Sequence, residues 1–239
     1  MKPSTLSVLS DDECGRLIEA ALEIVEKTGV LVTQPDVVDT LTGAGGSKGE
    51  DGRIRLTQAN LRDLLSTAPG RFAMHDRAGG IIEIGSGRCW TMCGGTVAKV
   101  MAWPDWNLRQ ATREDAARFA RLCDALPQSH CVVPVVEAQD VEPSHAEAIS
   151  FAETLAHTTK FALACPVRHQ SARAWVEMVR IATDKSDLSE HPTAGLLATL
   201  LPNLHLDDDC AATSVLAARE GMPLVCMAGS IAGSSGPNT

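Results

Sequence analysis

The chain has 239 residues, of which 44% are hydrophobic and 21% are charged, and its formal net charge is −9. This composition is typical of a folded globular protein and excludes extended disorder. The acidic balance argues against binding to nucleic acid or to an anionic membrane, which attract basic proteins. No apolar run reaches about 18 residues and the N-terminus lacks an apolar signal core, so we expect no membrane span and a cytoplasmic location.

Three helical patterns come first. Asp11 or Asp12 can cap a first helix, whose apolar residues recur with the 3.6-residue period. Pro35 opens a second helix, and Thr57 begins a third after an alternating strand at residues 53–56. These elements predict a small helical cap at the N-terminus.

A different pattern follows between residues 72 and 101, where short alternating runs are separated by glycine turns. This pattern predicts a β meander that leads into the first strand of a larger sheet. We therefore expect residues 1–85 to hold the helical cap and the meander.

From Thr112 onward, helical and strand patterns alternate, beginning with a capping-box-like start at Thr112 and Asp115. The predicted strands cover residues 130–137, 160–165, 195–201 and 223–228, and the predicted helices cover residues 145–158, 171–183 and 208–220. Such units build a parallel sheet that closes into a barrel or opens into a doubly wound sheet. No GxGxxG fingerprint follows a strand, which disfavours a dinucleotide fold. We expect an α/β fold in which residues 86–239 form the first part of a TIM-type (β/α)8 barrel, truncated before closure.

Polar side chains at the ends of the predicted strands are the candidate site residues, because barrel enzymes gather their chemistry there. Glu137 follows the first of these strands and either attracts a cation or caps the next helix. Arg168 follows the second strand and suits a planar carboxylate. Asn203 follows the third strand.

The cysteines do not indicate a metal centre or a disulfide framework. All eight are scattered along the chain, and several lie within apolar patterns where a thiol behaves as a small hydrophobe. Neither Cys89 with Cys93 nor His205 with Cys210 has the spacing of a zinc site. We expect reduced thiols and no metal.

Several short segments resemble a known family when they are taken in order. They are Ala20–Val30, Ala68–Pro69, His75–Arg77, Glu137–Val141, Thr159–Phe161 and Ala232–Gly233. Together they resemble the trimethylamine methyltransferase family, which includes glycine betaine corrinoid methyltransferases. The resemblance runs over nearly the whole chain but covers only the N-terminal half of such a protein, and it implies a TIM-type barrel.

The resemblance implies a methyltransferase that moves a methyl group from a tertiary or quaternary amine to the cobalt of a corrinoid protein. The implied partners are a small methylated amine and the corrinoid protein, and no cofactor is bound directly. It also implies a homo-oligomer at full length, with this half inactive alone. The catalytic residues are unknown, because the remaining strand ends lie outside these residues.

Further site residues follow from this resemblance. Met227 and Gly229 lie where the substrate would bind, at a position where the family often has a proline. Gly233, Ser234 and Gly236 belong to a loop that either faces the corrinoid or only makes a turn.

Aromatic rings commonly bind quaternary ammonium groups. Trp90, Trp103 and Trp106 are the possible cage members, whereas Trp175 and Phe119 fall on the core faces of helices. Two other functions stay open: a non-catalytic homologue that binds an amine or a corrinoid partner as a sensor or scaffold, and an unrelated barrel lyase that uses Glu137 as its base.

Overall fold

The chain forms two compact units in the computed structural model, which describes residues 8–200, 204–229 and 232–233. The first unit comprises the chain up to Gly70, residues 199–215 and the chain from Met227 onward. The second comprises Arg71–Ala198 and Leu216–Cys226. Each unit has its own hydrophobic core. The division expected after residue 85 stays a prediction.

The first unit packs three helices on a small sheet, as the N-terminal pattern predicts. Its helices are α1 (Asp11–Thr28), α2 (Pro35–Gly43) and α3 (Gln58–Ser66), and its strands lie in the order β12 (His205–Leu206), β1 (Val30–Val32), β3 (Arg53–Arg55) and β2 (Ser47–Lys48). Val32, Ile54 and Leu56 form its core together with Ala211. The sequence pattern did not predict β12, which pairs in parallel with β1.

The start of α1 corrects one prediction. Ser10 is the N-cap in place of Asp11 or Asp12, because its hydroxyl accepts a hydrogen bond from Glu13 N at 3.3 Å. The Glu13 carboxylate in turn accepts from Ser10 N at 2.8 Å, which completes a capping box. Thr57 caps α3, as predicted.

The second unit is built on a five-stranded sheet whose strands lie side by side in chain order. They are β6 (Met92–Cys93), β9 (Cys131–Val132), β10 (Phe161–Ala164), β11 (Ala194–Leu200) and β13 (Leu224–Ala228). The pairs β6–β9, β9–β10 and β10–β11 are parallel. Sequential parallel strands are the arrangement of a barrel, whereas a doubly wound sheet reverses its strand order.

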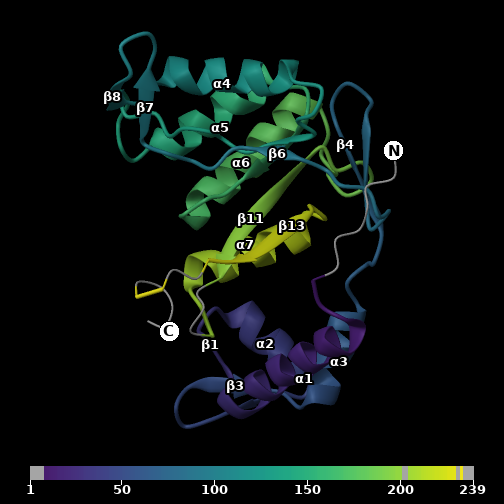
Figure 1. Ribbon diagram of the computed structural model, residues 1–239. Coiled ribbons are helices and arrows are strands. Elements are labelled where there is room, and N and C mark those ends of the chain that lie inside the picture. The colour runs from purple at the N-terminus through teal and green to yellow at the C-terminus, as the bar shows by residue number, and fades with distance from the viewer. Residues whose placement is uncertain (1–7, 201–203, 230–231, 234–239) are drawn as a thin grey trace. The chain divides into compact units, whose positions relative to one another are not determined.

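Helices α4 (Arg113–Ala125), α5 (Ala146–His157) and α6 (His169–Thr183) pack side by side within this unit (Figure 1). Helix α7 (Asp208–Arg219) follows β12, and its first turn is capped by Asp207, whose carboxylate accepts from Cys210 N at 2.9 Å. The run Asp207–Asp209 thus forms the start of α7. None of the helices in the described part of the chain combines the length and apolar character of a bilayer span.

The strand expected at residues 130–137 is wrong in its length. Regular pairing covers only β9 and is followed by an isolated parallel bridge between Val97 and Val136. Pro134 explains the interruption, because proline has no N–H to donate to a neighbouring strand.

The single meander expected between residues 72 and 101 is also wrong. The segment contains the hairpin of β4 (Phe72–His75) with β5 (Ile81–Ile84), and its last residues begin a second hairpin, in which β7 (Lys99–Ala102) pairs with β8 (Asn107–Gln110). Between them, β6 joins the parallel sheet. Two residues of strand are too few to show an alternating pattern in the sequence.

Alternate residues of β10 face two different cores. Ala162 and Ala164 pack with Phe151 and Trp175 on the helix-covered face, whereas Phe161 and Leu163 pack with residues of the β4–β5 hairpin. Backbone bonds fix this hairpin next to the start of the strands, since Arg77 N donates to Thr159 O at 2.6 Å and His75 N donates to Pro192 O at 2.9 Å. The hairpin therefore covers the second face at the N-terminal end of the sheet.

Candidate functional site

Glu137 lies between β9 and α5, directly after the isolated bridge at Val136, and its own N–H donates to Val97 O at 3.0 Å. Val136 and Ala138 on either side of it are fully buried, and Ala138 N donates to the hydroxyl of Ser150 on α5 at 2.9 Å. Strand alternation directs Glu137 to the opposite side from these two residues. Its side chain is half-buried, and its carboxylate forms no hydrogen bond or ion pair with any described residue. The Glu137 carboxylate can thus contact a ligand, and it does not cap α5.

Arg168 lies in the loop that connects β10 to α6. Its side chain is exposed, and Nη2 donates to Ser144 O at 3.3 Å. No acidic side chain pairs with it among the described residues. Since β9 and β10 are neighbouring parallel strands, Glu137 and Arg168 stand at the same edge of the sheet.

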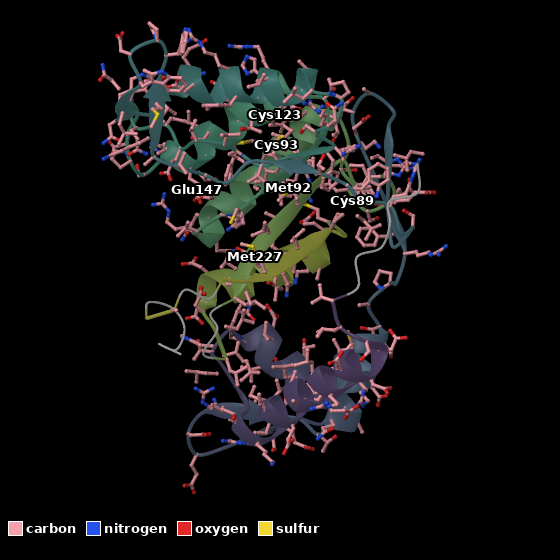
Figure 2. The ribbon with its side chains drawn as sticks, in the orientation of Figure 1. Cys89, Met92, Cys93, Cys123, Glu147 and Met227 are labelled. Atoms are coloured by element: carbon pink, nitrogen blue, oxygen red, sulfur yellow. The ribbon has the colours of Figure 1, made fainter. Side chains whose placement is uncertain are left out.

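Glu147, in the first turn of α5, is a further charged residue at this edge that the sequence pattern did not single out (Figure 2). Its side chain is 7% exposed. Oε1 accepts from Val167 N at 2.6 Å, and Oε2 has no hydrogen-bond partner among the described residues. Acidic residues are common in the first turn of a helix, where they complement the helix dipole, so nothing in the sequence distinguishes Glu147.

Three of the other predicted site residues lie in the described part of the chain. Met227 on β13, Gly229 and Gly233 belong to the first unit, and Met227 is exposed. Gly233 has a φ of 73°, which favours glycine, while a Cβ added at Gly229 would meet only Thr199 Cγ2 at 3.5 Å. Asn203, Ser234 and Gly236 lie outside the described residues.

Two of the three possible cage members contact each other. Trp103 and Trp106 pack edge to face with ring centroids 5.3 Å apart. The Arg88 guanidinium lies 5.6 Å from the centre of the Trp90 ring and already serves as its cation. Trp175 is fully buried, as its helical position predicts.

Two thiols of the second unit, Cys123 and Cys131, are buried in its core. Cys93 on β6 lies beside Cys123 on α4 (Figure 2). Burial, together with Cys93, raises the pKa of the Cys123 thiol to about 11, and burial alone raises the pKa of Cys131 to about 11. Such thiols are poor nucleophiles at neutral pH. No cluster of three potential metal ligands occurs in the residues that the structure describes.

Comparison with known proteins gives one consistent family. The trimethylamine methyltransferase (MTTB) family matches the chain over residues 2–239. Trimethylamine methyltransferase MttB of Desulfitobacterium hafniense is 25% identical over 141 residues, which are 58% of this chain and 28% of that protein. Glycine betaine methyltransferase of the same species is 22% identical, over 97% of this chain and 48% of that protein. Trimethylamine methyltransferase MttB2 of Methanosarcina mazei is 23% identical with the same coverage.

The chain spans about half the length, or less, of the curated relatives that it matches. Over its own length the family match is nearly complete, and it agrees with the resemblance seen in the short segments of the sequence. The chain belongs to the trimethylamine methyltransferase family.

Proposed function

We propose that the protein transfers a methyl group from a methylated amine to the corrinoid of a partner protein. The observation that supports this most directly is the unpartnered carboxylate of Glu137 at the carboxyl end of β9, in a chain that belongs to this family. In parallel α/β barrels this end of the strands carries the chemistry. The proposal includes closure of the five-stranded sheet into a TIM-type barrel in the complete protein.

The corrinoid of the partner supplies a strong cobalt nucleophile that takes the methyl group while the C–N bonding pair leaves with the amine. This chain's contribution is to bind and orient the amine and to keep water away from it. Glu137 attracts the ammonium group, and Arg168 pairs with the carboxylate of a betaine-type substrate. We propose that the complete protein is a homo-oligomer located in the cytoplasm.

The test is a methyl-transfer assay with the complete protein, a reduced corrinoid protein and a panel of methylated amines that carry deuterated methyl groups. We expect the deuterated methyl group on the corrinoid and one demethylated amine. No transfer from any amine contradicts the proposal. Binding of an amine by calorimetry without transfer would favour the alternative, a sensor or scaffold.

A further inference from the structure

Two thiols meet on the helix-covered face of the parallel sheet. In the register of β6 and β9, Met92 pairs with Cys131 and Cys93 pairs with Val132. Cys131 packs against the β4–β5 hairpin, so strand alternation directs Cys93 to the opposite face of the sheet, together with Val132. Helix α4, which contacts β9 and packs beside α5, carries Cys123 toward the same face.

The side chains of Cys93 and Cys123 contact each other, and the two thiols form a hydrogen bond (Figure 2). Both cysteines are free thiols; Cys123 is 4% exposed, whereas Cys93 is half-buried. Sulfur atoms at hydrogen-bond distance meet one condition for a disulfide, which is that the two side chains point toward each other. A reagent in the solvent reaches Cys93 first, because Cys123 is covered.

We propose that Cys93 and Cys123 are a site of reversible oxidation, at which a hydroperoxide converts the two thiols into a disulfide. Hydrogen peroxide transfers one oxygen atom to the Cys93 sulfur as its O–O bond breaks, which gives a sulfenic acid and one water molecule. The Cys123 sulfur then attacks the Cys93 sulfur. The S–S bond forms, the S–O bond breaks, and the hydroxyl group leaves as a second water molecule with the thiol proton of Cys123.

The contact between the sulfur atoms compensates for the weak nucleophilicity of Cys123. Burial, together with Cys93, raises the pKa of the Cys123 thiol, which is therefore protonated at neutral pH. An attacking group that already touches its target reacts far faster than one that must first meet it in solution. Cys123 thus acts on the oxidised Cys93 and not on reagents from the solvent.

The disulfide would join β6, which lies at one edge of the described sheet, to α4. The segment that begins with β6 runs beside the segment that carries Glu137. Val133 N donates to Cys93 O at 2.8 Å, and Glu137 N donates to Val97 O at 3.0 Å. Oxidation would therefore fix the backbone that positions a residue of the candidate site.

The test treats the complete protein with hydrogen peroxide, blocks the remaining thiols with iodoacetamide and digests the protein without reduction for mass spectrometry. We expect a linked pair of peptides that contain Cys93 and Cys123, which dithiothreitol should separate. Cys93→Ser should abolish the link. Cys89→Ser is the matched control, because Cys89 is exposed and precedes β6, and it should leave the yield of the link unchanged.

Cys123→Ser separates the two steps of the reaction. Without the second thiol, Cys93 should remain a sulfenic acid, and its labelling by dimedone should rise severalfold over that of the wild type. If this variant does not fold, the linked peptides of the wild type decide. A link from Cys93 to another cysteine, oxidation of Cys93 to a sulfinic acid without a link, or peroxide treatment that leaves Cys93 unmodified would each overturn the inference.

Discussion

The charged side chains at the two ends of the parallel sheet differ in their hydrogen-bond partners. At the N-terminal end, Lys160 Nζ donates to Cys123 O at 2.7 Å and also to Leu126 O, and the Asp124 carboxylate accepts hydrogen bonds from Thr158 and Thr159. At the carboxyl end, the Glu137 carboxylate has no partner among the described residues, and Glu147 is satisfied at one oxygen only. At the N-terminal end these charged groups form hydrogen bonds within the chain, and at the carboxyl end two carboxylates have an oxygen without a partner among the described residues.

This difference suggests that the groups at one end contribute to stability and those at the other end to binding. In barrel folds, polar residues at the N-terminal ends of strands support the structure, while those at the carboxyl ends carry function. Charged groups left without partners cost stability, and such violations of local consistency are expected at functional sites. Substitutions at the two ends should therefore affect different measurements.

The largest effect on stability is expected from a substitution on the helix-covered face of the sheet, which supports both of its ends. Trp175 is fully buried, and its Nε1 donates to Gly195 O at 3.1 Å. Trp175→Ala should lower the free energy of unfolding by about 3–5 kcal/mol in a denaturant titration, because it leaves a large cavity and removes a buried hydrogen bond. A loss below about 1 kcal/mol would show that this core does not support the sheet.

Asp124→Ala tests the N-terminal end of the sheet. Burial acts to raise the pKa of Asp124, but hydrogen bonds from Thr159 and Thr158 outweigh it, and the pKa is lowered. Removing this acceptor leaves three donors without a partner and should cost about 1–3 kcal/mol of unfolding free energy. Ligand affinity should not change. A variant with normal stability and weakened betaine binding would reverse the comparison between the two ends.

Asp115, at the start of α4, contrasts with Glu137, because its carboxylate has hydrogen-bond partners. The Arg109 guanidinium, 2.6 and 2.8 Å away, holds the pKa of Asp115 well below its usual range, with help from Thr112. A carboxyl whose folded pKa is depressed stabilises the fold above its unfolded pKa of about 4 and loses that contribution as the pH falls.

Asp115→Asn should therefore cost about 1 kcal/mol near pH 7, and its difference from the wild type should shrink as the pH drops below about 4. Thermal unfolding of both proteins between pH 7 and pH 3 measures this. A difference that grows toward acid pH would contradict the assigned ion pair.

Glu137→Gln should have the smallest effect on stability. Because the carboxylate has no partner among the described residues, its replacement by an amide should change the unfolding free energy by no more than about 0.5 kcal/mol. Thermal unfolding against the wild type measures this change. A large loss would reveal a structural role for Glu137 and would remove it from the site.

Much of the framework could be predicted because its elements are long or continuously apolar. The apolar patterns of β10 and of the helices α4 to α6 reflect burial against a single neighbouring layer. The approximate positions predicted for these elements were therefore confirmed. The failures occur where tertiary pairing decides. Pro134 shortens β9, and β6 and β12 have two residues each, which only their neighbours in the sheet make into strands.

The site was predicted less completely than the fold. Strand position identified Glu137 and Arg168, because the carboxyl ends of parallel strands can be located from the sequence. Glu147 was missed, because what sets it apart is an absent partner for one buried oxygen, and a sequence does not show partners. A cation cage that includes Trp90, Trp103 or Trp106 stays a prediction, and the sequence did not show that the rings of Trp103 and Trp106 pack against each other.

A cation site at the carboxyl end of the sheet is tested most directly by the affinity for glycine betaine divided by that for 3,3-dimethylbutanoate, in which carbon replaces the ammonium nitrogen. The ratio is measured in the wild type, in Glu137→Gln and in Asp124→Ala. We expect the wild type to prefer the cation, Glu137→Gln to lose about tenfold of this preference, and Asp124→Ala to keep it despite its lower stability. An equal ratio in all three proteins would contradict a cation site at the carboxyl end of the sheet.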